Sequence, residues 1–287
     1  MMNLYKINAG FFKLDGGAMY GVVPKSLWQK FNPADKDNLC TWALRCLLVE
    51  TADRLVLIDN GMGYKQSDKF FSYYHPHGED TLEKSFAKHG FDKEDVTDVI
   101  LTHLHFDHCG GSVQWNRDRS GYETSFKNAL YWTTKGQWDL ALNPNPREKA
   151  SFLRENLLPI QESGRLRFLD YHNDYAADAL PGISIQIVHG HTEAMILPIV
   201  RHPSATLMYM ADLLPSVSHI PLPWIMSYDV NPLITLKEKE TLLARAMQEE
   251  WVLFFEHDPL IACCTLQQTE KGIRVKNTGG LADFISP

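Results

Sequence analysis

The stretch Thr102-His103-Leu104-His105-Phe106-Asp107-His108 decides the fold, and it follows directly on the apolar run Val99-Ile100-Leu101. Side chains two positions apart at a strand end point the same way, so His103 and His105 can bind one metal ion together. The chain must then turn if the adjacent Asp107 and His108 are to reach a common site. Cys109-Gly110-Gly111 supplies conformational freedom for that turn and for a following helix. Two ligand pairs facing neighbouring points predict a site for two ions about 3.5–4 Å apart.

Three later residues can complete such a site, because each follows an apolar strand. His191 lies in the turn after 185–188, Asp212 follows 207–211, and His257 follows 252–256. The ends of several strands can meet at one edge of a pair of sheets, where loops build a site on a rigid frame. We therefore expect these three residues to converge on the 102–108 stretch.

The chain has 12 histidines, and most of them need no special role. A single histidine is usually a surface residue or a hydrogen-bonded core residue. We favour His191 over His189 as a ligand, because Gly190 and Thr192 shape the turn around it. We interpret His89, His172 and His202 as ordinary residues. The same holds for the pair His75 and His77, because this pair lacks a preceding strand and an acidic partner.

Composition narrows the class of protein. The chain has 287 residues, of which 44% are hydrophobic and 22% charged, as is typical of globular proteins. Its net charge of -7 argues against nucleic acid or an anionic membrane surface as a partner. It has no run of 18 apolar residues and no signal-like N-terminus. Five scattered cysteines favour a reduced, cytoplasmic protein over a disulfide scaffold.

The pattern of apolar residues and turns predicts a meander of strands followed by alternating strands and helices. The predicted strands are 4–14, 18–23, 43–50, 54–58, 96–101, 129–132, 183–188, 206–210 and 251–256. Capping-box spacing predicts helices at 80–89, opened by Asp80 and Glu83, and at 236–250, opened by Thr235 and Glu238. Helical segments within 133–162 break at 143–146. This order predicts an α/β layered sandwich, with a single domain over 1–287.

The residues quoted above resemble the metallo-β-lactamase superfamily. The match consists of T-H-x-H-x-D-H at 102–108, G-H-T at 190–192, Asp212, His257 and the earlier element Leu57-Ile58-Asp59-Asn60-Gly61. It extends in order over essentially the whole chain. The resemblance implies an αββα sandwich with a dinuclear metal site at one edge of the sheets. Glu193-Ala194 departs from the Pro-Gly that usually follows the G-H-T motif, and Asn60 from the usual Thr or Cys.

The resemblance also implies which residues bind the metal ions. Asp59 would brace the ligand loop from behind. The seven ligands offer only nitrogen and oxygen, so zinc fits, and iron, manganese and cobalt fit as well. The implied set is His103, His105 and His191 for the first ion, Asp107, His108 and His257 for the second, and Asp212 as the bridge.

Within the superfamily, the chain looks like the quorum-quenching N-acyl-homoserine lactonase branch. The supporting stretches are 15–25, 211–215 and 219–229. Some lactonases have a tyrosine that contacts the substrate carbonyl three residues after the bridging aspartate, and Pro215 stands there instead. We expect His219 or Tyr228 to replace it. The branch further suggests a homodimer.

The implied reaction is attack of a metal-bridging hydroxide on the carbonyl of a lactone or ester, with N-acyl-homoserine lactones as the favoured substrates. Asp107, as a ligand and proton carrier to the leaving alkoxide, and His219 are the expected catalytic residues. An apolar pocket suits an acyl chain. The expected substrate-binding residues are Met19, Tyr20, Trp28, Trp224 and Tyr228.

Other functions stay open on the same residues. A phosphotriesterase similar to methyl-parathion hydrolases would direct the same hydroxide at phosphorus. A persulfide dioxygenase would share the H-x-H-x-D-H run but hold one iron, and the complete set of seven ligands favours two ions instead. A glyoxalase-II-like thioesterase lacks support, because no basic segment near the C-terminus is present to bind glutathione carboxylates. A binding module without catalysis is disfavoured by the complete ligand set.

Overall fold

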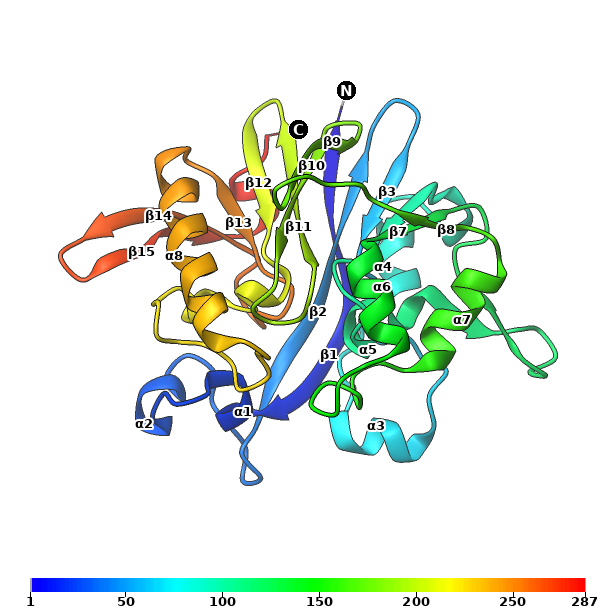
Figure 1. Ribbon diagram of the computed structural model, residues 1–287, viewed down its shortest axis with the longest axis horizontal. Coiled ribbons are helices and arrows are strands. Elements are labelled where there is room, and N and C mark those ends of the chain that lie inside the picture. The colour runs from blue at the N-terminus through cyan, green and yellow to red at the C-terminus, as the bar shows by residue number, and fades with distance from the viewer. Residues whose placement is uncertain (1, 287) are drawn as a thin grey trace.

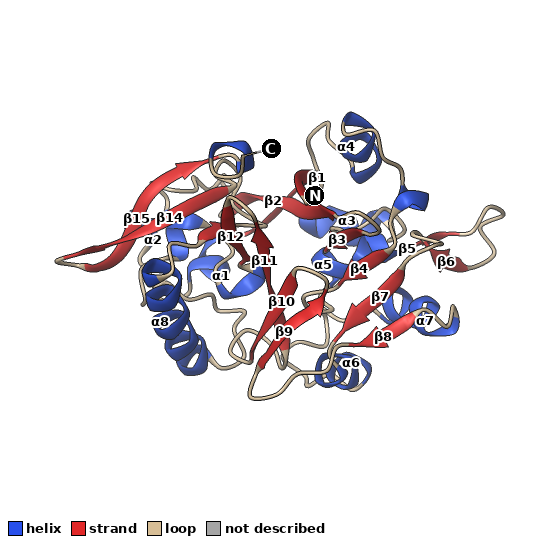
Figure 2. Ribbon diagram, turned by 90° about the horizontal axis from the view of Figure 1, so that it is seen from above, coloured by secondary structure: helices blue, strands red, loops and turns tan. Residues whose placement is uncertain are grey.

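Two β-sheets face each other, with helices on their outer sides, in the computed structural model, which describes residues 2–286. Figure 1 shows the long strands β1 (Asn3–Asp15) and β2 (Leu39–Glu50) running through the middle of the molecule. Figure 2 places α8 (Pro232–Gln248) outside one sheet and α4 (Leu82–Lys88), α6 (Lys135–Leu142) and α7 (Arg154–Glu162) on the opposite side. The predicted αββα sandwich is therefore confirmed.

The first sheet has the strand order β1-β2-β3-β4-β7-β8. Its later strands are β3 (Leu55–Ile58), β4 (Asp98–Ile100), β7 (Leu130–Thr133) and β8 (Leu166–Phe168). From β3 to β8 the strands pair in parallel, so their carboxyl ends meet at one edge. The residues that follow β3 and β4 at this edge are Asp59 and the 102–108 stretch. A separate hairpin is formed by β5 (Val113–Trp115) and β6 (Tyr122–Thr124).

The second sheet has the order β15-β14-β13-β12-β11-β10-β9. Only β12 and β13 pair in parallel, so the segments after them, which carry Asp212 and His257, leave the sheet at the same edge. Its strands are β9 (Tyr175–Leu180), β10 (Ile183–Val188), β11 (Met195–His202), β12 (Ala205–Tyr209), β13 (Val252–Phe254), β14 (Cys263–Thr269) and β15 (Gly272–Gly279).

Side chains on opposite faces of β2 pack into two different hydrophobic layers. Leu47 and Val49 of β2 belong to the cluster between the sheets, together with Ile185 and Leu253 from the second sheet. The residue between them in β2, Leu48, belongs to the cluster beneath the helices. Since side chains alternate across a strand, the apolar run 46–49 of β2 packs on both faces of the sheet.

Three predicted elements differ from the structure. The helix predicted from Asp80 begins at Leu82, because Thr81 caps it by accepting the Lys84 N–H at 3.2 Å. The stretch 18–23 is not a strand, because Asp15 accepts the Ala18 N–H at 2.8 Å and caps the short helix α1 (Gly16–Tyr20). The last long helix begins at Pro232 rather than 236, since proline is well suited to the first turn of a helix. The remaining helices are α2 (Lys25–Trp28), α3 (Asp68–Tyr74) and α5 (Phe106–Cys109).

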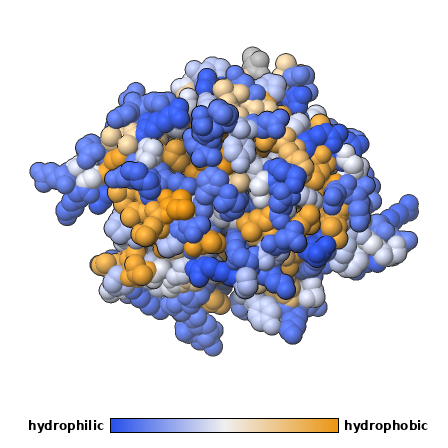
Figure 3. Space-filling view, in the orientation of Figure 1, coloured by the Kyte–Doolittle hydropathy of each residue, from blue (hydrophilic) through white to orange (hydrophobic). Residues whose placement is uncertain are grey.

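The surface mixes hydrophobic and hydrophilic side chains, and the orange areas in Figure 3 are separated by blue ones. The exposed apolar residues include Val22, Leu27 and Leu233. No helix within residues 2–286 is both long enough and apolar enough to cross a membrane. The homodimer suggested by the lactonase resemblance stays a prediction.

Candidate metal centre

The 102–108 stretch bends sharply after β4. His105 precedes α5, so Asp107 and His108 lie on a single helical turn. The following glycines serve close packing rather than the freedom expected for the turn, because Gly110 has an ordinary helical φ of -62°. A Cβ at Gly110 would lie 2.3 Å from the Met62 carbonyl oxygen, and one at Gly111 would lie 2.2 Å from that of Asn60. The helix turn is therefore pressed against the 59–63 loop.

Two groups of buried ligand atoms gather at the shared edge of the sheets. His103, His105 and His191 form one group, and Asp107, His108 and His257 form another. Within each group, the ligand atoms lie within 4.8 Å of one another. His191 Nε2 is 3.3 Å from His105 Nδ1, and His257 Nε2 is 3.1 Å from His108 Nε2. The structure thus brings together all six of these residues from distant parts of the chain.

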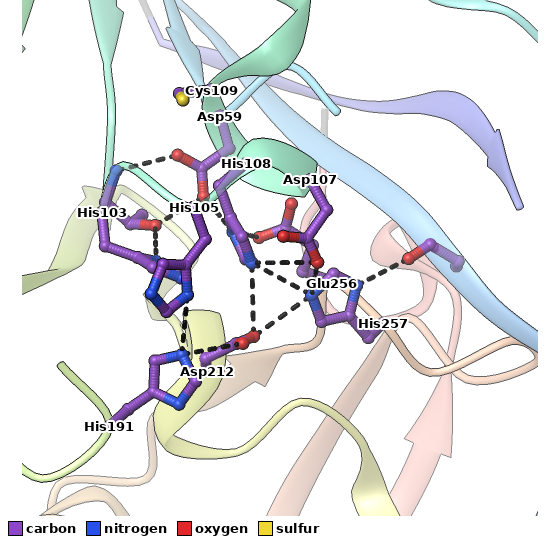
Figure 4. A network of polar contacts seen from close by, with 12 residues as sticks. Asp59, His103, His105, Asp107, His108, Cys109, His191, Asp212, Glu256 and His257 are labelled. Atoms are coloured by element: carbon purple, nitrogen blue, oxygen red, sulfur yellow. Dashed lines mark hydrogen bonds and ion pairs between the residues drawn. The ribbon is translucent and has the colours of Figure 1, made fainter. Parts of the chain in front are cut away.

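Asp212 lies between the two groups (Figure 4). Its Oδ2 atom is 3.2 Å from His191 Nε2, in the first group. Its Oδ1 atom is 3.1 Å from His257 Nε2 and 3.5 Å from His108 Nε2, in the second group. Each carboxylate oxygen therefore faces a different set of imidazoles, which is the arrangement a bridging ligand needs.

Hydrogen bonds on the far side of the imidazoles determine which ring nitrogen faces the cluster. His191 Nδ1 donates to Asp229 Oδ1 at 2.9 Å, and His257 Nδ1 donates to the Ala43 carbonyl at 2.7 Å. His103 Nδ1 lies 3.1 Å from the Thr102 hydroxyl, which itself donates to a carboxylate and so accepts from the ring. In each case Nε2 is the ring nitrogen that faces the cluster, where a metal ion would bind it.

Asp59 lies beneath the ligand stretch, where the resemblance assigned it a bracing role. It accepts the Thr102 N–H at 2.8 Å and the Thr102 hydroxyl at 2.6 Å. Its Oδ2 is also 3.1 Å from His108 Nδ1. Glu256, which the sequence reasoning missed, is equally buried and has Oε2 3.0 Å from the same nitrogen. Its position directly before His257, at the end of an apolar run, is the signal that could have identified it.

The neutral imidazole of His103 and its unpartnered ligand atom suit divalent cations. Burial and the neighbouring imidazoles hold the pKa of His103 well below its usual range, so its ring is neutral. Burial, helped by Glu256, raises the pKa of Asp59 to about 8. Within the described chain, His103 Nε2 is buried and has no hydrogen-bond partner. Such atoms are costly to bury unless something coordinates them, and imidazole with carboxylate suits zinc and other transition metals.

A pocket of about 300 Å³ opens onto the ligand cluster. Met19 and Tyr228, two of the expected substrate-binding residues, lie on its wall. Residues that the sequence reasoning missed complete the wall, namely Leu14, Tyr74, Phe106, Arg147, Glu148, Ser151 and Ser227. A larger hollow of about 640 Å³ lies elsewhere, among residues such as Tyr64, Lys93 and Trp115, and none of the clustered ligands lines it.

His219 does not fit the catalytic role expected for it. It is buried behind Met19, whose carbonyl oxygen is 2.9 Å from its Nε2, and its Nδ1 is 2.7 Å from Ser216 Oγ. Burial lowers the pKa of His219 to about 3, although the bond to Met19 acts in the opposite direction. Both ring nitrogens are thus occupied, and the residue is absent from the wall of the 300 Å³ pocket.

Three of the expected substrate contacts pack with His219 in one aromatic cluster instead of on the pocket wall. The Tyr20 ring stacks on His219 with centroids 4.8 Å apart and on Trp28 at 5.1 Å. The Trp224 ring meets Tyr20 edge-on at 5.8 Å. Their aromatic side chains pack against one another, so they support the Met19 wall from behind.

Two residues on the pocket wall connect it to the metal ligands and to the rim. The Glu148 carboxylate accepts the Thr192 hydroxyl at 2.6 Å and has Oε2 3.7 Å from His105 Nε2. Arg147 donates to the Ser227 carbonyl oxygen across the pocket mouth. The sequence around 147–148 indicates neither contact, because the partner residues are far away along the chain.

Comparisons with known proteins agree with this geometry. Residues 45–257 match the family model described as the metallo-β-lactamase superfamily. The chain is 22% identical over 268 residues to N-acyl homoserine lactonase AiiA of Bacillus thuringiensis subsp. kurstaki, over 89% of this chain and 92% of that protein.

Two solved structures are also similar. One is a probable metal-dependent hydrolase from Staphylococcus aureus, with a TM-score of 0.86 and 26% identity over 96% of each chain. The other is AidC, a dizinc quorum-quenching lactonase with a bound product, with a TM-score of 0.74 and 24% identity over 98% of this chain and 95% of that one.

Proposed function

This chain belongs to the metallo-β-lactamase superfamily, and we propose that it uses two divalent metal ions to hydrolyse lactones or esters, with N-acyl-homoserine lactones as the favoured substrates. The observation that carries the proposal is the position of Asp212, with one carboxylate oxygen toward each group of ligands. Each group of three ligands would then hold one ion, and Asp212 would connect the two. The lactone class is supported by the relatives, since AiiA is named an N-acyl homoserine lactonase.

His103, His105 and His191 would hold one ion, Asp107, His108 and His257 the other, and Asp212 both, with zinc the proposed metal. When bound, such ions supply a Lewis acid and a water molecule of lowered pKa. The outer hydrogen bonds of His103, His191 and His257 keep these three rings turned toward the cluster. Less reorganisation is then needed when metal and substrate arrive.

Tyr228 is the group we propose to contact the substrate carbonyl in place of the residue at Pro215. It lies on the pocket wall, together with Asp107 and Asp212. Burial and then the nearby Tyr74 and Asp107 raise its pKa, so its hydroxyl keeps the proton that it would donate. A donor aimed at the oxygen where charge develops stabilises the transition state more than the ground state.

Asp107 is the group we propose to carry a proton to the leaving alkoxide. Its Oδ2 lies 3.7 Å from His257 Nε2 and 3.8 Å from His108 Nε2, and the side chain also reaches the pocket. A carboxylate at the boundary between the ligand cluster and the pocket can meet both the water and the leaving group. The apolar side chains Leu14, Met19 and Phe106 would accommodate an acyl chain on the same wall.

The test is a substrate screen of the purified protein, with metal analysis of the same sample. Acyl-homoserine lactones of several chain lengths are compared with aryl esters, paraoxon-type phosphotriesters and a glutathione thioester. We expect about two metal ions per chain and the highest kcat/KM for a lactone. A preference for phosphotriesters would replace the proposed substrate class, and one iron per chain with oxygen uptake would replace hydrolysis by dioxygenase chemistry.

His105→Ala and Asp107→Ala test whether this site performs the reaction. Each should lower kcat/KM for a chromogenic lactone by about 1000-fold or more, since metal activation contributes several kcal/mol. His172→Ala is the matched control, because this histidine is exposed and outside both ligand groups. Circular dichroism verifies that the variants are folded, and full activity in both ligand variants would refute the site.

A further inference from the structure

Lys239 is a completely buried lysine in the middle of α8. Its Nζ donates to the carbonyl oxygens of Trp224 at 2.7 Å, Pro221 at 3.1 Å and Leu222 at 3.2 Å. An ammonium group has three N–H donors, so these contacts use all of them. Every acceptor that Nζ contacts in the described chain is a backbone carbonyl of one short segment. The lysine therefore holds the shape of that segment.

Burying a charge in this way is expensive, which argues against simple packing as its purpose. An apolar side chain of similar length would fill the same space without the cost of removing an ammonium from water. Only a group with three hydrogen-bond donors at one point can gather three carbonyl oxygens that point inward. We therefore connect the cost of removing the Lys239 ammonium from water with the conformation that it gives the 221–224 segment.

That segment begins the loop that forms one side of the pocket. Residues 221–231, called the pocket loop below, carry Tyr228 on the pocket wall and Asp229 against His191. At its far end, the pocket loop is fastened by Val230 N to the His191 carbonyl at 3.1 Å and by Asn231 N to that of Gly190 at 2.8 Å. Lys239 fastens the near end, so the pocket loop is held at both ends.

Glu238, the residue before Lys239 in α8, holds the turn that carries His191. Glu238 accepts the N–H groups of His189 at 2.6 Å and Gly190 at 3.1 Å. These amides belong to the turn that presents the ligand His191. Adjacent side chains of one helix therefore hold two different parts of the site, the ligand turn through Glu238 and the pocket loop through Lys239.

We propose that Lys239 is a positioning residue for substrate, which places Tyr228 over the metal ligands by fixing the near end of the pocket loop. Glu238 is its counterpart for the metal, because it fixes the turn before His191. The role of Lys239 in the reaction rests on the proposed lactone or ester hydrolysis. Its role in holding the loop does not depend on that reaction.

The experiment compares Lys239→Gln with Lys237→Gln, a matched control on the exposed side of the same helix. For Lys239→Gln we expect amides of 222–228 to exchange hydrogen about tenfold faster, because charge-assisted bonds are lost. kcat for the preferred substrate should fall about tenfold, with KM and metal content changed less than twofold, because Tyr228 acts on the developing oxyanion. Lys237→Gln should match the wild type, and Glu238→Gln should loosen 189–191 and lower zinc affinity instead.

Unchanged exchange at 222–228 in Lys239→Gln would overturn the proposal, as would a loss of metal that accounts for the loss of activity. If Lys239→Gln does not fold, Lys239→Arg serves the same test, because it keeps the charge but spreads its donors over a plane. If the wild type hydrolyses no lactone or ester, the proposed function fails, and the exchange and metal measurements still decide whether Lys239 holds the pocket loop.

Discussion

The imidazole of His191 and the carboxylate of Asp229 are joined by a hydrogen bond of 2.9 Å between Nδ1 and Oδ1, and both side chains are buried. One of these residues belongs to the ligand cluster and the other to the pocket loop. The bond therefore links the position of the metal ligand to the position of the pocket wall, on which Tyr228 is the adjacent residue.

Asp229→Ala should weaken metal binding, because His191 would lose the partner that keeps its Nε2 turned toward the cluster. Removing such an outer partner typically lowers metal affinity about 10- to 100-fold. Zinc affinity is measured by competition with a chromophoric chelator. Asp139→Ala, on the exposed side of α6, is the control and should leave the affinity as it is. Equal affinities in the two variants would show that the bond does not orient the ligand.

Tyr228→Phe should lower kcat/KM about 10- to 100-fold, as expected when one donor to a developing oxyanion is lost. Metal content and the free energy of unfolding should change little, because the ring remains in place. Steady-state kinetics on the best substrate of the screen gives the measurement. Tyr122→Phe, on the distant β5–β6 hairpin, is the matched control. Wild-type kinetics in Tyr228→Phe would leave the carbonyl contact to another group.

Gly190→Ala should damage the ligand turn by steric overlap with α8. The added Cβ would lie 2.2 Å from Thr235 Oγ1 and 2.4 Å from Thr235 N, so backbone must move. Overpacking of this kind costs about 1–3 kcal/mol, and the shift should also lower zinc affinity. Urea unfolding with and without zinc measures both effects. Gly121→Ala is the control, since its nearest neighbour would be 3.7 Å away; similar stabilities would argue against the close approach.

His219→Gln should change how the stability of the protein depends on pH. The pKa of His219 is about 3 in the folded protein, below the value of 6.5 for an unperturbed histidine, so the neutral ring stabilises the fold above pH 6.5. This contribution is lost as the pH falls from 6.5 toward 3, at a rate of up to about 1.4 kcal/mol per pH unit.

Urea midpoints at pH 7.5 and pH 5.5 test this for the wild type and His219→Gln. The wild type should lose more stability than the variant between the two values, because glutamine does not titrate. The variant itself should be less stable at pH 7.5 by about 1–3 kcal/mol, since Ser216 or Met19 loses a buried partner. A variant of unchanged stability but much reduced kcat would instead restore the catalytic role first expected for His219.

The sequence was most informative where ligands lie at strand ends. His103, His105, Asp107 and His108 are close in the chain, and a strand followed by a turn leaves them few ways to point apart. The more distant ligands His191, Asp212 and His257 were expected because each follows an apolar strand, and the resemblance to a known family assigned them to the two ions. The structure brings all seven together, with Asp212 between the two groups.

Glu193-Ala194 stands where Pro-Gly usually follows the G-H-T motif, yet the second residue keeps a glycine-like backbone conformation. Ala194 has a positive φ of 55°, the left-handed conformation that glycine favours. The residue that stands where the family usually has glycine thus adopts a conformation that glycine favours. Composition and periodicity give no sign of this, because neither glutamate nor alanine is typical of turns.

By itself, the sequence determined an α/β layered sandwich and a cluster of nitrogen and oxygen ligands at strand ends, and the resemblance of its motifs to a known family implied the αββα arrangement. Only the tertiary structure decided which aromatic residues face the pocket. Tyr228 lines it, whereas Tyr20, Trp28, Trp224 and His219 stack behind it. It also decided the roles of Glu256 and Lys239, whose partners come from distant segments. The physical reason is that a side chain's burial and hydrogen bonds depend on which segments pack against it, and spacing along the chain does not specify that packing.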